Sequence, residues 1–424
     1  MTDSSQYLIS RLEAVDWDFV ARSARKSPFT TFHWYPGQLI SQIPATLIGL
    51  LTNPGDTVVD PFAGSGSVVT EAHRLDRLAI AIDINPIALQ IIAAKSLKLS
   101  AQEIRRITNE LVVEVGSFMG HDLISRSLSE SVPNPPPTVQ LSKWYSAQVG
   151  TDLCRLWNYC GSQEGNRRII CDAAFSSILK QACRETRSWG YVCDNVDPDS
   201  NKKRKFAKES PDDSGFNARI DEPLSNEIQR VKERSKDVLM LLAACLKKLN
   251  NGYEEQEKSR GTSESKLATQ MRVTCIRESS ITALERVNTA SVSLVLTSPP
   301  YFGVHDYAKS QRLSMEWLGY DIAQIRDQEI GARSKRARRS AANDYLEEMT
   351  EVFGAAHRVL KPGGWLAMIV GESEIKSREG IVSRLQQSIE KMGFSHTFDK
   401  KRQIGKERAQ APKVQTEQVL VWRK

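Results

Sequence analysis

The spacing of apolar residues along the chain predicts strands that alternate with helices. Short apolar runs, which are typical of buried strands, occupy 57–59, 78–82, 273–276, 292–297, 365–370, 394–398 and 418–422. Segments between them have apolar positions at helical spacing, at 39–51, 68–74, 344–360 and 381–392, and a further helix starts at 85–86. This alternation indicates an α/β fold built on a mostly parallel sheet.

The middle of the chain follows a different pattern. We expect helices at 101–127, 144–159, 169–186 and 224–249, separated by a Pro-rich linker at 131–137 and a highly charged loop at 197–213. A second charged linker is expected at 250–265, and a polar loop at 302–340. The chain then divides into two sheet-forming parts, 1–104 and 266–424, with a mostly helical insertion at 105–265 between them.

Composition restricts the kind of protein without identifying it. The 424 residues carry a formal charge of +7, with no apolar run long enough to cross a membrane and no signal-peptide pattern. The seven cysteines include no CxxC pair and match no zinc pattern, so we expect reduced thiols and no metal. These features predict a cytoplasmic protein. Basic clusters at 202–205, 333–339 and 400–408 are weak indications of a polyanionic partner.

A glycine-rich turn follows the first predicted strand. It reads Asp60-Pro61-Phe62-Ala63-Gly64-Ser65-Gly66-Ser67, and Asp83 ends the second predicted strand. The interval between the two acids is close to the roughly 20 residues expected of a nucleotide-binding βαβ unit. No phosphate-binding lysine follows the glycines, and Asp60 would repel a pyrophosphate. The pattern favours S-adenosylmethionine, which carries an amine and a sulfonium, over NAD, with Asp83 on the ribose hydroxyls.

The strand predicted at 292–297 ends in Thr297-Ser298-Pro299-Pro300-Tyr301. Two consecutive prolines cannot continue a strand ladder, so the chain turns a stiff corner at the carboxyl end of the sheet, where open α/β sheets place their sites. The corner offers a hydroxyl, backbone carbonyls without ladder partners, and an aromatic ring. Together these groups can hold a flat ring that bears an amine. The alternative is that the strand simply ends in a loop.

Taken together, the two motifs resemble those of the S-adenosylmethionine-dependent amino-methyltransferases of DNA, which modify cytosine N4 or adenine N6. The turn is similar to the family's cofactor motif, and the corner to its catalytic motif in the version typical of the cytosine-N4 branch. The resemblance covers about 29–100 and 270–424. It implies a Rossmann-like class I methyltransferase sheet of seven mostly parallel strands, with 1–104 binding cofactor, 266–424 carrying catalysis, and the insertion as a candidate target-recognition domain.

The resemblance also implies which residues form the site. The catalytic residues are Ser298, Pro299, Pro300 and Tyr301. The cofactor-binding residues are Asp60, Phe62, Ala63, Gly64, Ser65, Gly66, Asp83, Ile84, Glu278, His33 and Tyr35. Of these, the two aromatic residues at 33 and 35 belong to a segment similar to one that packs on the methionine end of the cofactor. The residues expected to contact nucleic acid are Phe302, His305, Arg333, Lys335, Arg336, Arg338 and Arg339. For Glu278, contact with the cofactor adenine and a surface carboxylate remain equal alternatives.

An exocyclic amine is a poor nucleophile because its lone pair is delocalised into the ring. The Ser298 hydroxyl and the Pro299 carbonyl would accept its two hydrogens, so that the lone pair faces the methyl group and transfer is direct. A target base in a duplex must leave the stack, and Tyr301 would then stack on it. The chain has no Pro-Cys pair, which carbon-5 methylation of cytosine typically requires.

The primary hypothesis is a DNA cytosine-N4 methyltransferase acting on double-stranded DNA, with adenine N6 as its close variant. A restriction or defence nuclease is a candidate partner, and the oligomeric state is open. A second hypothesis is an RNA methyltransferase acting on a guanine exocyclic amine, although the lead-in before residue 31 is expected to leave no room for an RNA-capture domain. A third is a binding protein that keeps the fold without turnover.

Overall fold

The computed structural model describes residues 3–19, 27–118, 134–184, 237–260, 273–335, 338–372, 380–404 and 416–424. The charged loop predicted at 197–213, the basic cluster at 202–205 and Arg336 lie wholly outside these ranges. The predicted helices at 101–127, 169–186 and 224–249, the linkers at 131–137 and 250–265, and the basic cluster at 400–408 lie partly outside them. Within the ranges, no helix is long and apolar enough to cross a membrane. The same part of the chain holds no group of His, Cys, Asp and Glu suited to a metal ion.

Seven strands form one sheet in the order β3-β2-β1-β4-β5-β7-β6. Their bounds are β1 Thr57–Asp60, β2 Leu78–Ile82, β3 Val273–Ile276, β4 Val292–Thr297, β5 Leu360–Glu372, β6 Ser395–Gln403 and β7 Thr416–Arg423. The first five strands in this order pair in parallel, whereas β7 is antiparallel to both β5 and β6. The structure confirms the prediction of a seven-stranded, mostly parallel α/β sheet.

Helices cover both faces of this sheet. The first face carries α1 Asp3–Glu13, α3 Gln42–Leu51 and α4 Ser67–Arg74, and the second carries α12 Ser280–Glu285, α16 Ala341–Val359 and α17 Ile381–Lys391. Val58 and Leu294 belong to the core of the first face, and their neighbours Val59 and Val295 to the core of the second. Successive strand residues point to opposite faces, so a sheet buried on both sides needs continuous apolar runs.

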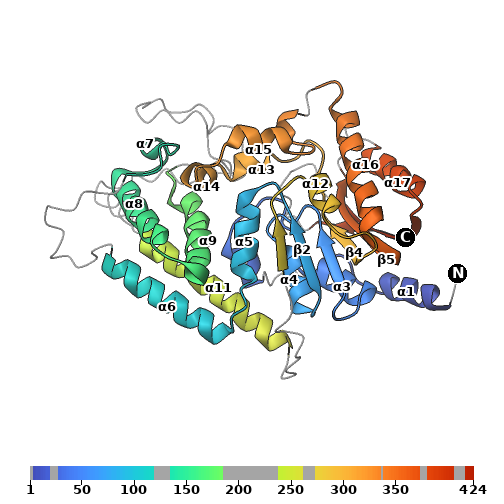
Figure 1. Ribbon diagram of the computed structural model, residues 1–424, viewed down its shortest axis with the longest axis horizontal. Helices are drawn as coiled ribbons and strands as arrows, with labels where there is room; N and C mark the ends of the chain where they lie inside the picture. The colour runs from blue at the N-terminus through green and yellow to red at the C-terminus, as the bar shows by residue number, and fades with distance from the viewer. Residues whose placement is uncertain are drawn as a thin grey trace, which may run out of the picture.

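The insertion adds a layer of helices beside this sandwich. Its helices are α6 Ala101–Phe118, α7 Leu141–Trp144, α8 Ala147–Gly161, α9 Gly165–Ala182 and α11 Val238–Arg260. They share one apolar core with α2 Pro28–Phe32 and the end of α5 Pro86–Lys95. Figure 1 shows α6, α8, α9 and α11 on the α5 side of the sheet, away from α16 and α17. Contact is close at Gly252 of α11, where a Cβ atom would lie 2.2 Å from the Phe29 ring.

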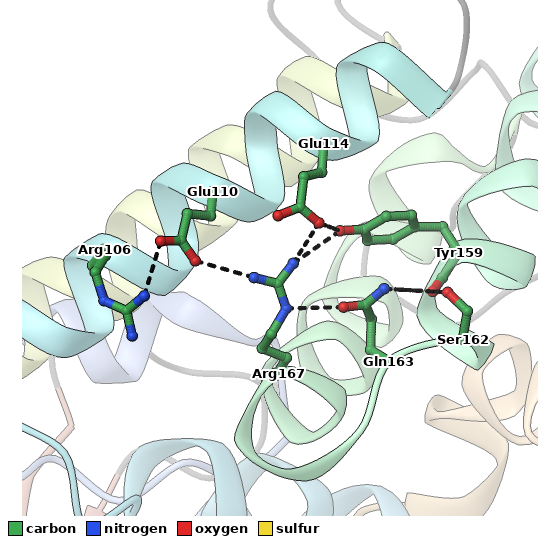
Figure 2. A network of polar contacts seen from close by, with 7 residues as sticks. All are labelled: Arg106, Glu110, Glu114, Tyr159, Ser162, Gln163 and Arg167. Atoms are coloured by element: carbon green, nitrogen blue, oxygen red, sulfur yellow. Dashed lines mark hydrogen bonds and ion pairs between the residues drawn. The ribbon is translucent and has the colours of Figure 1, made fainter.

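One arginine ties three helices of the insertion together. Arg167 of α9 donates to Glu110 and Glu114 of α6 at 3.1 and 2.6 Å, and to the Tyr159 hydroxyl of α8 at 3.2 Å. Its Nε donates to the side chain of Gln163 at 2.9 Å. Figure 2 shows the guanidinium reaching both carboxylates. Each nitrogen of this guanidinium therefore has an acceptor, which is typical of a structural contact.

The segment predicted as a charged linker at 250–265 is helical as far as Arg260. The inner side of α11 is anchored there, because the Tyr253 hydroxyl donates to the Ala94 carbonyl and accepts from the Leu97 backbone N–H, each at 2.9 Å. Tyr253 is 3% exposed. The charged composition of this stretch reflects only its outer side, which explains why the sequence predicts a linker.

The segment predicted as a polar loop at 302–340 also contains helices. They are α13 Tyr307–Ser310, α14 Arg312–Trp317, α15 Ile322–Gln328 and a 3-10 turn at Arg333–Lys335. Trp317 is fully buried in the core of the insertion, beside Tyr145, Trp157 and Phe175. These partners are distant in sequence, so the helices depend on contacts that local composition does not show.

Candidate active site

A cavity lies at the carboxyl ends of β1 and β4. The chain leaves β1 for β2 and β3 on one side and returns as β4 on the other, which makes this the topological switch point where ligands bind in such sheets. The cavity has a volume of about 250 Å³, and its walls include the ends of β1 and β2, the proline corner, and the segments 35–39, 279–281 and 328–330. The two sequence motifs therefore meet at one opening.

The glycine turn is shaped by close packing. Gly66 precedes α4 with φ +83°, and a Cβ atom there would lie 2.5 Å from Ile92 Cγ1. Gly64 donates its backbone N–H to Asp83 Oδ2 at 2.8 Å, which links the turn to the end of β2. Lys95 Nζ donates to the carbonyl of residue 65 at 2.8 Å, and burial lowers the pKa of this lysine to about 7. Both the backbone angle and the space at position 66 thus require glycine.

Two aspartates reach the cavity from the ends of β1 and β2. Asp60 is 3% exposed, and its Oδ1 accepts from Thr297 Oγ1 at 2.7 Å and from the Phe62 backbone N–H at 3.1 Å. Burial raises the pKa of Asp60 to about 7, although these hydrogen bonds act in the opposite direction. Asp83 accepts from the Asn85 backbone N–H at 2.8 Å, and burial raises its pKa to about 6. A nearby cation would favour the ionised form of both carboxyls.

A third carboxyl enters the cavity from the end of α15. One oxygen of Glu329 accepts from the Ala308 backbone N–H, whereas the other is buried without a hydrogen-bond partner among the described residues. Burial raises the pKa of Glu329 to about 8. Glu348 of α16 also lines the cavity, and none of its walls that the structure describes carries a positive charge. The cavity is therefore suited to a cationic ligand rather than to a phosphate.

The proline corner places a hydroxyl beside these acids. Ser298 and Pro300 line the cavity, whereas Pro299 and Tyr301 do not. The Pro300 carbonyl accepts from the Tyr345 hydroxyl at 3.0 Å, which holds the corner against α16. The corner also joins the cofactor turn through the hydrogen bond between residues 297 and 60 described above. These contacts fix the proline corner relative to the glycine turn.

Most residues predicted to bind a cofactor lie together around the cavity. Its walls include Tyr35, Asp60, Phe62, Ala63, Gly64, Ser65, Asp83 and Ile84. Tyr35 stacks on Tyr307, with ring centroids 6.1 Å apart. Glu278 does not line the cavity but pairs with Arg286 at 2.6 Å, while the three residues that follow it do line it. The structure thus brings the glycine turn, the end of β2 and one of the two aromatic residues predicted at 33 and 35 into a single site.

His33 is a packing residue, contrary to the prediction. Its Nε2 lies 2.8 Å from Ser176 Oγ of α9, and its Nδ1 lies 2.7 Å from the Trp34 carbonyl. Burial lowers the pKa of His33 to about 4, so its ring is neutral at physiological pH. The segment 32–36 therefore divides its side chains, with residue 35 at the cavity and residue 33 against the insertion.

The residues predicted to contact nucleic acid separate into two groups. Phe302 is 7% exposed and packs on Tyr345 with centroids 5.5 Å apart, so it belongs to the core, contrary to the prediction. Lys335 donates its Nζ to the carbonyls of Asp327 and Glu329, at 2.7 and 2.8 Å, and thereby holds the end of α15. Lys335 nevertheless stays partly accessible, as does His305, and Arg333, Arg338 and Arg339 are exposed.

Two wall residues carry no signal in the sequence that marks them as part of a site. Glu329 lies in a segment whose composition predicts a loop, and Glu348 occupies a polar position of an amphipathic helix. Both positions resemble ordinary solvated carboxylates until the fold shows what surrounds them. An acid of this kind can be recognised only from tertiary structure.

Sequence comparison places the chain in a known family. A family model for DNA methylases, N6_N4_Mtase, matches residues 12–94 and 292–424, about half of the chain. The Type II methyltransferase M.BsoBI of Geobacillus stearothermophilus is 24% identical over 339 residues, which cover 76% of this chain and 59% of that protein. The Type II methyltransferase M.MjaII of Methanocaldococcus jannaschii is 27% identical over 108 residues, which cover 24% of this chain and 20% of that protein.

The chain thus spans less than two thirds of the length of these curated relatives. Among solved structures, a proposed DNA modification methylase from Thermus thermophilus is similar, both as a selenomethionine derivative and in complex with S-adenosyl-L-methionine. The identities are 22% and 21%, the TM-scores 0.22 and 0.23, and the matches cover 34% of this chain and 49% and 50% of those chains. Because the family model matches half of the chain and includes both motifs, the protein belongs to the DNA methylase family.

Proposed function

We propose that this protein transfers a methyl group from S-adenosylmethionine to an exocyclic amine of a base in DNA, with cytosine N4 as the favoured target. The observation that carries the proposal is the acidic cavity, without a basic residue among its described walls, that opens beside Ser298. Buried acids repel phosphates, so a cavity of this charge disfavours a dinucleotide or a nucleoside triphosphate. S-adenosylmethionine instead carries an ammonium and a sulfonium.

The wall residues fit the parts of this cofactor. Asp83 directly follows β2, the position at which an acid binds ribose hydroxyls in nucleotide-binding βαβ units. Asp60 and the unpartnered oxygen of Glu329 offer acceptors to a cationic group. Phe62 and Ile84 provide apolar wall surface. When bound, the cofactor supplies an electrophilic methyl group on its sulfonium.

The proline corner provides acceptors for the target amine. The Ser298 hydroxyl and the Pro299 carbonyl would accept the two amine hydrogens and draw the nitrogen towards a tetrahedral geometry. Its lone pair then leaves conjugation with the ring and becomes available for transfer. Holding the amine in this orientation supplies much of the rate, and no covalent intermediate with the protein is needed.

The DNA side of the proposal rests on accessible cations and on the catalytic motif. Arg333, Arg338 and Arg339 are exposed between α15 and α16 and would contact phosphates, so affinity should fall with salt. A target in double-stranded DNA would be flipped and would stack on Tyr301. The version of the motif at 297–301 favours cytosine N4, with adenine N6 as the alternative. The insertion at 105–265 is the candidate target-recognition domain, and a cognate nuclease in the cytoplasm is a candidate partner.

Transfer of label to nucleic acid tests this function directly. The purified protein is incubated with methyl-labelled S-adenosylmethionine and with matched unmethylated DNA or RNA, and the digested nucleosides are identified by mass spectrometry. Asp60→Ala and Tyr301→Ala should abolish transfer. Ser162→Ala, an exposed change in the insertion, is the control for handling and should retain it.

Each outcome decides between the hypotheses. N4-methylcytosine in DNA, lost in both site variants, is the expected result. N6-methyladenine in DNA would keep the mechanism and change the target base. Label in RNA alone would overturn the DNA assignment. Cofactor binding without transfer to any substrate would support a binding protein that has lost turnover.

A further inference from the structure

Behind the proline corner, a chain of hydrogen bonds runs from the catalytic serine to the far edge of the sheet. Ser298 Oγ lies 3.3 Å from the Tyr301 hydroxyl, and that hydroxyl lies 3.0 Å from Glu417 Oε1. The other carboxylate oxygen, Glu417 Oε2, pairs with Arg402 Nη1. Arg402 in turn donates its Nε to the Trp17 carbonyl at 2.9 Å. Four side chains and one carbonyl thus form a continuous relay that does not contact the cavity except through Ser298.

Rigid elements hold the inner end of this relay. Glu417 on β7 and Arg402 on β6 are directly opposite each other in the antiparallel ladder, and Glu417 is also opposite Gly371 of β5. The side chain of Arg402 is 5% exposed and that of Glu417 is 14% exposed, so solvent screens their pairing little. The guanidinium of Arg402 can only donate, so Glu417 Oε2 accepts from it. The carboxylate can therefore act only as an acceptor.

This acceptor sets the direction of every hydrogen bond in the relay. The Tyr301 hydroxyl has a single proton and must donate it to Glu417, so its oxygen can only accept from Ser298. Burial and the charge of Glu417 raise the pKa of Tyr301 well above its ordinary range, so the phenol keeps that proton. Ser298 then directs its own single proton at Tyr301. The lone pairs of Ser298 Oγ stay free to accept from a group in the cavity.

We propose that Glu417, held by Arg402, is a positioning residue that makes the Ser298 hydroxyl an obligate acceptor for the amine of the target base. This inference rests on the proposed function, in which Ser298 accepts one of the amine hydrogens. If the serine proton faced the cavity, it would meet the hydrogens of the amine or bind its lone pair, and either contact would oppose transfer. Tyr301 accordingly serves the reaction through its hydroxyl, which lies behind Ser298.

A double-mutant cycle tests the proposal with the full-length protein. Glu417→Gln replaces the obligate acceptor with an amide that can also donate, and Tyr301→Phe keeps the ring but breaks the relay. The rate constant of methyl transfer to DNA is measured in single turnover for the wild type, each variant and the double variant. We expect each single variant to be about tenfold slower or more, and Glu417→Gln to have no further effect in the Tyr301→Phe background.

A merely structural role would give a different pattern. Dissociation constants for S-adenosylmethionine and for DNA, and base flipping followed by 2-aminopurine fluorescence, should match the wild type in Glu417→Gln. Because this variant leaves Arg402 buried without its partner, the pair Glu417→Gln with Arg402→Met provides a second variant without that charge. It should show the same loss of rate. Asp56→Asn, which changes the partner of Lys361 at the amino end of β1, is the charge-matched control and should keep the wild-type rate.

The outcomes separate this inference from the function on which it rests. A wild-type protein that transfers no methyl group overturns both. A wild type that transfers, with Glu417→Gln as fast as the wild type, overturns the inference alone. Losses that multiply in the double variant would also overturn it, because Glu417 would then act by a route that does not pass through the Tyr301 hydroxyl.

Discussion

Acidic side chains have different surroundings in the cavity and in the helical insertion. In the insertion, Glu110 and Glu114 are both held by Arg167. In the cavity, Asp60 and Glu329 are buried, and no basic side chain stands among the walls that the structure describes. The acids of the insertion are paired with a cation because they only hold helices together. The acids of the cavity lack such a partner, and a cationic ligand can take its place.

The buried acids of the cavity lower the stability of the ligand-free protein. Burial raises the pKa of Asp60 to about 7 and that of Glu329 to about 8, which means that folding disfavours their ionised forms. A bound cation would offset that cost. Binding of a cationic ligand in the cavity should therefore stabilise the protein. Substitutions in the insertion should leave the affinity for this ligand unchanged.

The largest effect is expected from Gly66→Ala. A Cβ atom there would lie 2.5 Å from Ile92 Cγ1, at a residue whose φ is +83°, so packing and backbone are both strained. We expect the free energy of unfolding to fall by about 3 kcal/mol, with loss of S-adenosylmethionine binding. Denaturant unfolding and calorimetric titration measure the two effects.

A glycine of the insertion provides the control for that change. Gly165 also has a positive φ, +55°, but nothing lies within 4 Å of a Cβ atom there. We expect Gly165→Ala to lower the free energy of unfolding by only about 1 kcal/mol, with cofactor affinity unchanged. Equal losses in the two variants would show that the glycine turn is no more constrained than the insertion.

Asp60→Asn should weaken binding and stabilise the ligand-free protein. The amide oxygen can still accept from Thr297 and from the Phe62 backbone N–H, so the turn keeps its geometry. At about pH 8 we expect the free energy of unfolding to rise by about 1–2 kcal/mol, because an ionised buried group is removed. Affinity for S-adenosylmethionine should fall by about tenfold or more. A variant that is less stable and binds normally would contradict the comparison.

The stabilisation by Asp60→Asn should depend on pH. The pKa of Asp60 is about 7 in the folded protein against 3.8 for the free side chain, so the folded state keeps a proton that the unfolded chain releases. The stabilisation that this bound proton gives the folded state is fully present below about pH 4 and is lost as the pH rises to about 7. The difference in unfolding free energy between variant and wild type should grow over that range and then level. A difference that is constant from pH 4 to 8 would contradict the assignment.

Arg167→Met tests the insertion side of the comparison. The change keeps an apolar stem and removes the cation that joins Glu110, Glu114 and Tyr159. The two carboxylates are partly exposed, so we expect a loss of only about 1 kcal/mol in the free energy of unfolding. The dissociation constant for S-adenosylmethionine should match the wild type. A weakened cofactor affinity would show that the insertion and the cavity are coupled.

The smallest effect is expected at the surface, from Arg339→Ala. This side chain is exposed and would contact a phosphate, so its loss should weaken DNA binding by about three- to fivefold and reduce the slope of log affinity against log salt by about 1. Lys391→Ala, in the last turn of α17, is a control that removes one exposed charge outside the insertion. Equal effects of the two changes would point to net charge rather than a phosphate contact.

The strands and the two motifs could be predicted from the sequence because their signals are local. The bounds predicted for β2, β3 and β4 agree with the structure, and each follows from a short apolar run closed by a polar or turn residue. The residues of the glycine turn lie at the cavity because a βαβ unit brings the ends of adjacent strands together. Neither result required knowledge of distant contacts.

The features that the sequence did not predict depend on contacts between segments far apart in the chain. Trp317 drives a helix within a polar segment only because the insertion supplies its partners. His33 and Tyr35 are two residues apart, and only the position of α9 decides that the first packs while the second faces the cavity. Glu417 lies 116 residues after Tyr301 and meets it only because β7 is inserted between β5 and β6.

The most direct test of the central claim is a calorimetric titration of the ligand-free protein with S-adenosylmethionine and, separately, with ATP. The two ligands share adenosine but carry opposite charge. Their affinities therefore show directly which charge the cavity accepts, given that its described walls are acidic and include no basic residue. We expect S-adenosylmethionine to bind at a single site, with binding weakened by Asp60→Asn and no detectable binding of ATP. Binding of ATP in preference to S-adenosylmethionine would contradict the account.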